Sequence, residues 1–133
     1  MGMIELQGRR IYKGMAEGET LVTRVDISFY GGVDPETGEV VEKDHPLEGK
    51  SVSGKVLVMP SGKGSTVGSY VLYALKKADK APIAIINKET DPVIAVGSII
   101  SEIPTVDKID IDKIEAGRKV KVDADRGIIM VEK

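Results

Sequence analysis

The sequence predicts a mixed α/β domain in which compact, barrel-like β layers pack with one main helix. Apolar and polar residues alternate in parts of the first half, as they do in strands with one buried face. Residues 67–78 instead repeat their apolar side chains with the period of a helix. Two short apolar runs, residues 55–59 and 82–87, flank that helix as buried strands do. We expect all 133 residues, 1–133, to form a single domain of this layered β/β/α kind.

The first half is expected to consist of strands and turns. Its pattern predicts strands over residues 4–13 and 20–28, the first of them as a strand pair around Gln7 and Gly8. Glycine, proline and aspartate gather over residues 31–38, which is typical of turns. A loop is expected from there to Gly49.

The second half is expected to hold the main helix. The side predicted to face the core consists of Val67, Tyr70, Val71, Ala74, Leu75 and Ala78. The remaining segments are predicted to be a short strand at 94–96 that leads into a turn or helix over 97–103, a strand at 105–106, one helical turn at 110–114, and a closing hairpin of residues 118–122 and 128–131.

Composition excludes several classes of function. Lysine and arginine number 19 against 21 acidic residues, so the net charge of −2 leaves no electrostatic footprint for nucleic acid. The chain has no cysteine, and His45 is its only histidine. This chain alone therefore offers neither thiolates for zinc or an iron–sulfur cluster nor a multi-histidine site. None of its residues is expected as a metal ligand, although a carboxylate site for magnesium stays open. His45 is expected to be a loop residue.

The apolar segments are too short to cross a membrane. None approaches the roughly 18 residues that a transmembrane helix needs. Charged residues interrupt the N-terminal segment, so no signal peptide is expected and the protein is predicted to be cytoplasmic. The only amide side chains are Gln7 and Asn87, a scarcity that suggests a thermophilic source.

One segment, residues 60–66 with the sequence PSGKGST, concentrates groups suited to chemistry. It lies between a predicted strand and the predicted helix. Its glycines permit close backbone approach, its lysine adds a positive charge, and its three hydroxyl groups add polar contacts. Free N–H groups at a helix start attract anions, so a carboxylate or phosphate is the expected ligand. The candidate substrate-binding residues are Ser61, Gly62, Lys63, Gly64 and Thr66.

Two familiar phosphate-binding motifs do not fit this segment. A P-loop would need glycine where Leu57 stands, and serine or threonine directly after Lys63. A dinucleotide fingerprint would need its third glycine one place before Gly68. From the pattern alone, a tight turn with Ser65 capping the helix is the more ordinary interpretation.

Three stretches together resemble the aconitase X swivel-domain family. They are residues 31–38 (GGVDPETG), 44–47 (DHPL) and 62–73 (GKGSTVGSYVLY), and the resemblance extends through nearly the whole chain. It implies a swivelling β/β/α fold. It also implies a heterodimer with a large aconitase X subunit, which would hold a [4Fe-4S] cluster.

The resemblance also implies a reaction, catalysed only with the large subunit. This hydro-lyase would remove water from (R)-5-phosphomevalonate to give trans-anhydromevalonate 5-phosphate, in an archaeal mevalonate route to isoprenoids. Iron of the partner would take the leaving hydroxyl, and a serine of the swivel domain would remove the proton. Ser65 matches that catalytic serine, and Ser61 is the alternative base. Classical aconitases have arginine where Val67 stands, so the substrate carboxylate is expected to meet Lys63, backbone N–H groups or the large subunit.

Two alternatives stay open on the sequence. The chain could belong to a related dehydratase that acts on another hydroxy acid, such as a hydroxyproline. It could also be a non-catalytic anion-binding module, which would need no obligate partner.

Overall fold

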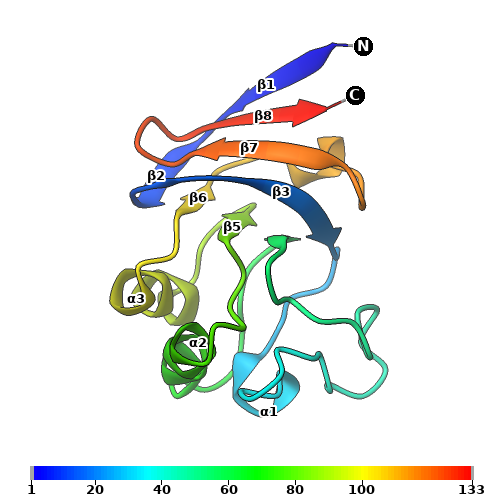
Figure 1. Cartoon of the computed structure of the whole chain (residues 1–133), viewed down its shortest axis with the longest axis vertical. Coiled ribbons are helices and arrows are strands. Elements are labelled where there is room, and N and C mark those ends of the chain that lie inside the picture. Colours follow the sequence, from blue (N-terminus) through cyan, green and yellow to red (C-terminus); the bar gives the residue numbers. More distant parts are fainter. Residues whose placement is uncertain (1, 133) are drawn as a thin grey trace.

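The computed structural model describes residues 2–132, which form two β layers and one helical layer (Figure 1). The strands are β1 (Met3–Gln7), β2 (Arg9–Tyr12), β3 (Met15–Val22), β4 (Val56–Met59), β5 (Ala84–Asn87), β6 (Thr105–Asp107), β7 (Lys119–Asp123) and β8 (Ile128–Glu132). The helices are α1 (Phe29–Gly32), α2 (Gly68–Lys77) and α3 (Pro92–Ser101), with a 3₁₀ turn η1 (Ile111–Lys113).

Strand β3 joins the two β layers. The strand order is β1-β8-β7-β3-β4-β5-β6-β2. Residues 15–19 of β3 pair antiparallel with β7, whereas residues 20–22 pair parallel with β4. The outermost strands β1 and β2 follow one another in the chain, and at this junction the Gly8 N–H donates to the Gly127 carbonyl oxygen at 2.8 Å. The two layers therefore curl toward each other at both ends, which confirms the barrel-like β arrangement.

The core has two parts, one between the two β layers and one between the parallel strands and the helices. In β4, Val56 and Val58 face the antiparallel strands β7 and β8 across the space between the sheets. Leu57 and Met59 alternate with them and pack under the helices, against residues such as Leu72. This alternation is what a strand buried on both faces requires. The mixed α/β, layered β/β/α class predicted from the sequence is confirmed.

The prediction of one main helix was wrong, because α3 is as long as α2. Each has 10 residues. Asp91 caps α3 by accepting hydrogen bonds from the N–H groups of Val93 and Ile94, both at 3.2 Å. Pro92 occupies the first turn, where its missing N–H costs nothing. The apolar run at 94–96, predicted as a strand, is therefore part of this helix.

Two strand predictions need correction. Residues 4–13 form two strands, but β1 pairs with β8 and β2 pairs with β6 rather than with each other. The strand expected at 20–28 instead spans Met15–Val22. It ends because the Thr23 hydroxyl accepts a hydrogen bond from the Val25 N–H at 3.0 Å, which turns the chain.

Helix α2 forms as predicted, but it buries a different side. Its buried residues are Gly68, Ser69, Leu72 and Leu75, whereas Tyr70 is 67% exposed. The small side chains face α3, where a side chain on Gly97 would clash with Leu72 at 2.5 Å. Close packing of two helices thus decides the buried side.

Within residues 2–132, every helix is too short or too polar to cross a bilayer. The buried strands, the closing hairpin and the single helical turn are confirmed.

Candidate functional site at the carboxyl edge of the parallel strands

The glycine-rich segment lies at the carboxyl end of β4, directly before α2. Ile27 holds it in place: the Ile27 N–H donates to the Ser61 carbonyl at 3.4 Å, and the Lys63 N–H donates to the Ile27 carbonyl at 3.1 Å. In sheets of this kind, ligands bind at the carboxyl ends of parallel strands. The fold therefore presents this segment where an active site is expected.

Gly62 permits a close contact between the loop and α3. Its N–H donates to Asp91 Oδ1 at 3.1 Å. A Cβ atom at this position would lie 2.7 Å from both Asp91 Oδ1 and Ile94 Cγ1. Since Asp91 also caps α3, one carboxylate positions both the loop and the start of this helix.

Gly64 has a backbone that other residues rarely adopt. Its φ angle is +86°, and a Cβ atom would lie 2.6 Å from Ser28 Oγ. The turn just before Ser65 therefore depends on glycine, and Ser28 limits the space beside it.

Lys63 is paired with a carboxylate of the chain itself. Its Nζ lies 3.0 Å from Glu42 Oε2, and Glu42 Oε1 accepts a hydrogen bond from the Ser28 N–H at 3.4 Å. Partial burial acts to raise the pKa of Glu42, but Lys63 and the Ser28 N–H outweigh it and lower that pKa below its usual value. Glu42 thus stays charged and compensates the positive charge of Lys63.

Ser65 is exposed on the surface, at the entrance to α2. Its Oγ accepts a hydrogen bond from the Val67 N–H at 3.1 Å. Among residues 2–132, the hydroxyl proton of Ser65 has no acceptor, and the N–H groups of Gly64, Ser65 and Thr66 have none either. A nest of open N–H groups of this kind suits an anion.

Ser61 lies in different surroundings. It is half-buried and borders an open hollow of about 660 Å³, whose other lining residues are Asp26, Pro60, Lys88, Glu89, Thr90, Asp91 and Pro92. In the described part of the chain, Lys88 makes no ion pair. The two serines considered as bases therefore share one loop but face different groups.

Sequence reasoning missed three residues that shape this edge: Glu42, Asp91 and Asn87. The Asn87 side chain is fully buried, donates to the Met59 carbonyl at 3.1 Å and accepts from the Thr90 hydroxyl at 3.0 Å. An amide directly after a buried apolar strand is a signal that could have found it. Glu42 gives no such signal, because its partner Lys63 is distant in the sequence.

His45 has a structural role. It is 6% exposed, its Nε2 lies 3.2 Å from the Asp26 carbonyl oxygen, and its Nδ1 accepts from the Leu47 N–H at 3.0 Å. Both ring nitrogens are therefore engaged, and the neutral tautomer protonated at Nε2 satisfies them.

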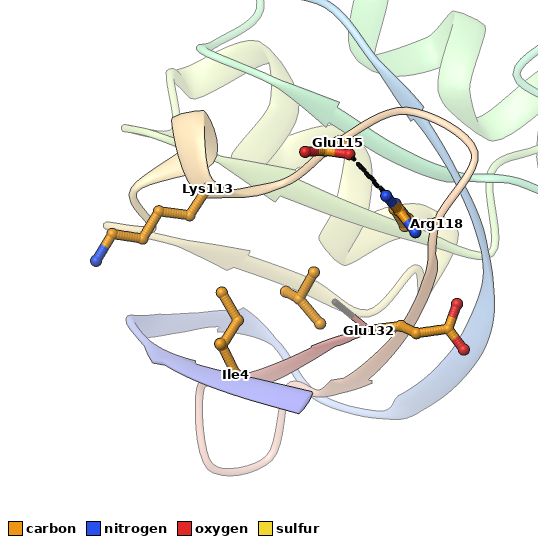
Figure 2. Close-up of a pocket in the computed structure, with 6 residues that line it drawn as sticks. Ile4, Lys113, Glu115, Arg118 and Glu132 are labelled. Atoms are coloured by element: carbon orange, nitrogen blue, oxygen red, sulfur yellow. Dashed lines mark hydrogen bonds and ion pairs between the residues drawn. The ribbon is translucent and has the colours of Figure 1, made fainter. Parts of the chain in front are cut away.

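Figure 2 shows a second hollow of the molecule. It measures about 220 Å³ and is lined by Ile4, Lys113, Glu115, Arg118, Val131 and Glu132. Glu115 and Arg118 form an ion pair across 3.1 Å, which the figure marks with a dashed line. This hollow shares no residue with the glycine loop and is not the candidate site.

The side chains of this chain do not fit an iron–sulfur cluster. The chain contains no cysteine. Within residues 2–132, no group of three or more histidine or acidic side chains is arranged to hold a metal ion. A cluster would need ligands from another polypeptide.

The chain is thus a mixed α/β domain of the layered β/β/α class that presents an open glycine loop at the carboxyl edge of its parallel strands. The chain belongs to the aconitase X swivel domain family, whose model matches residues 5–131. This confirms the family resemblance found in the sequence.

Named relatives and solved structures resemble the chain over almost its full length. The phosphomevalonate dehydratase small subunit of Thermococcus kodakarensis is 55% identical over 96% of each chain. That of Methanosarcina mazei is 58% identical over 95% of this chain and 90% of its own. The crystal structure of Thermococcus kodakaraensis aconitase X in its holo-form matches with a TM-score of 0.96 and 54% identity, covering 98% of this chain and 99% of that one. The solution structure of a UPF0107 protein matches with a TM-score of 0.89 and 49% identity, covering 98% of this chain and 100% of that one.

Proposed function

We propose that this chain is the small subunit of a hydro-lyase that dehydrates (R)-5-phosphomevalonate to trans-anhydromevalonate 5-phosphate. The observation behind the proposal is an exposed serine at an open glycine loop, in a chain 46–58% identical to phosphomevalonate dehydratase small subunits. The same relatives favour this substrate over a hydroxyproline. The chain would act in the cytoplasm.

Ser65 is the proposed base that removes the proton from the carbon next to the substrate carboxylate. A serine hydroxyl is a poor base, so Ser65 would act as an alkoxide that has released its own proton to solvent and then takes up the proton from the substrate carbon. The negative oxygen must therefore be stabilised. The Val67 N–H already donates to Oγ at 3.1 Å, and the positive end of the α2 dipole lies at the same place. Ser61 is the weaker candidate, because among residues 2–132 no donor contacts its hydroxyl.

The open N–H groups of Gly64, Ser65 and Thr66 are proposed to bind one of the two anionic groups of the substrate. The Gly62 N–H is not available to the substrate, since it donates to Asp91. The role of Gly62 is to lack a side chain, which lets the loop pack closely against α3. Lys63 adds positive charge from a fixed position beside Glu42. The hydroxyl of Thr66 is exposed and available as a further contact.

A separate large subunit is part of the proposal. The relatives are named small subunits, which implies that each works with a larger chain. This chain has no cysteine, so the [4Fe-4S] cluster that the family resemblance implies would be held by the large subunit. The part of this chain is proton removal and anion binding.

The test is dehydration of (R)-5-phosphomevalonate by the chain co-expressed anaerobically with its large subunit. Ser65→Ala should lower kcat by about 10²–10⁴-fold, as loss of a general base does. Ser53→Ala, a half-buried serine away from the loop, should leave kcat unchanged.

Full kcat in Ser65→Ala would remove the assigned role. If Ser61→Ala then abolished turnover, the base would be Ser61. A panel that includes a hydroxyproline tests the substrate: faster turnover of that compound would overturn the substrate assignment.

A further inference from the structure

Helix α3 is apolar nearly all round, yet one side of it faces outward. Its sequence, PVIAVGSIIS, contains no charged residue. Val96 is 48% exposed, Ile99 is 51% exposed and Ile100 is 37% exposed. A helix without a polar face is normally covered on every side. The outward side of α3 therefore has the composition of a buried surface.

The apolar surface continues onto α2. Val67, Tyr70 and Tyr73 are exposed and recur every three residues along this helix. The two helices touch, because Gly97 packs against Ser69 and Leu72. They lie side by side at one end of the molecule, whereas both chain ends lie at the opposite end (Figure 1). Together these exposed side chains form the outer helix face, which consists of Val67, Tyr70, Tyr73, Val96, Ile99 and Ile100.

Positive charge borders the outer helix face. Lys76 and Lys77 lie in the last turn of α2, and Lys80 follows the helix three residues later. Within residues 2–132, none of the three forms an ion pair. The Lys77 ammonium lies 5.3 Å from the centre of the Tyr73 ring. A complementary surface would be apolar at its centre and carry carboxylates beside these lysines.

We propose that the outer helix face is the docking surface for the large subunit. This inference rests on the proposed function, in which Ser65 must meet a reaction centre on another chain. Val67 and Tyr70 stand two and five residues after Ser65, so a partner that reaches Ser65 also covers this end of α2. A second copy of the chain seated here would instead separate Ser65 from the cluster.

The test is the affinity of the purified chain for its purified large subunit, measured anaerobically by calorimetry. Ile99→Glu should weaken binding at least about 30-fold, as loss of a central interface residue does. Val41→Glu is the matched control, since Val41 is 45% exposed and lies outside this face. Circular dichroism and thermal unfolding of each isolated variant show whether it folds.

A second variant keeps the test valid if Ile99→Glu does not fold. Lys77→Glu changes only an exposed side chain in the last turn of α2, and it should weaken binding more strongly at low salt. Unchanged affinity in either folded variant would overturn the proposed surface. So would a homodimer of the isolated chain that Ile99→Glu dissociates while affinity for the large subunit stays intact.

Activity separates this inference from the proposed function. If the wild-type complex forms but does not dehydrate (R)-5-phosphomevalonate, and Ile99→Glu weakens its assembly, the docking surface stands and the function fails. If the wild-type complex is active and the variants bind normally, only the docking surface fails. A weakened variant should regain activity at high large-subunit concentration, by mass action.

Discussion

Two halves of the molecule use their polar side chains differently. The parallel half consists of β4, β5 and β6, with β2 at its edge, and the helices; the antiparallel half consists of β1, β7 and β8. In the parallel half, buried or partly buried carboxylates join distant segments: Asp107 accepts from Arg9, and Asp91 accepts from Gly62. In the antiparallel half, ion pairs such as Arg118 with Glu115 and Arg126 with Asp123 join residues three positions apart. The two carboxylates of the parallel half thus join segments that are distant in the sequence, whereas these two pairs of the antiparallel half join close neighbours.

The largest effect on stability is expected at Arg9. Asp107 has a fully buried side chain, and it accepts from Arg9 Nε at 3.0 Å, from Arg9 Nη2 at 2.8 Å and from the Thr90 N–H at 2.9 Å. Burial acts to raise the pKa of Asp107, but Arg9 and the Thr90 N–H outweigh it and hold that pKa below its usual value. Arg9→Ala should lower the free energy of unfolding more than any other substitution considered below, because it leaves this carboxylate buried without its cation.

Urea unfolding of the isolated chain measures this loss. Arg10→Ala is the control, since the exposed Arg10 forms no ion pair within residues 2–132, and its effect should stay within about 0.5 kcal/mol. Equal losses in both variants would show that the buried pair is not what distinguishes the parallel half.

A methyl group at Gly62 should disturb the loop directly. Gly62→Ala would place Cβ against Asp91 and Ile94, and overpacking of this kind costs about 1–3 kcal/mol. A shift of the loop should also lower kcat of the complex by about 10²-fold. Gly117→Ala, in the antiparallel half, meets no atom within 4 Å and should cost only the strain of its φ angle, +78°, with kcat unchanged. Normal kcat in Gly62→Ala would mean that the loop tolerates displacement.

The pair of Glu42 with Lys63 should make the stability of the loop depend on pH. Because the pKa of Glu42 is lowered from 4.5 in the fold, its contribution is complete above that value and is lost as the pH falls through the lower folded pKa. Glu42→Gln should cost about 1 kcal/mol at neutral pH and little in acid. Unfolding measured between about pH 7 and pH 3 checks this difference. A cost that does not change with pH would show that the charge of Glu42 plays no part.

The smallest effect is expected at the exposed pair beside the hollow of Figure 2. Arg118→Ala should change the free energy of unfolding by less than about 1 kcal/mol, because exposed ion pairs contribute little. Thermal unfolding in low and high salt measures it. A loss as large as that of Arg9→Ala would remove the contrast between the two halves.

The sequence predicted those elements whose own residues set their structure. The run at 55–59 and the helix that begins near Val67 show their periods directly. The first half of helix α3 was predicted as a strand because its Val and Ile residues resemble one, although Asp91 followed by Pro92 is a recognisable helix start. Its second half falls in the segment predicted as a turn or helix. The loop was found from its glycines. Its contacts with Glu42 and Asp91 were not, because they depend on how distant segments come together.

A single strand shared by both sheets has a mechanical consequence. Strand β3 pairs with β7 through residues 15–19 and with β4 through residues 20–22. A tilt of either the antiparallel or the parallel sheet would therefore also move the other sheet. The chain should then melt in one calorimetric step and behave as a rigid block. In the proposed complex, any movement of Ser65 relative to the substrate is therefore expected at the joint between this chain and the large subunit rather than within the shared strand.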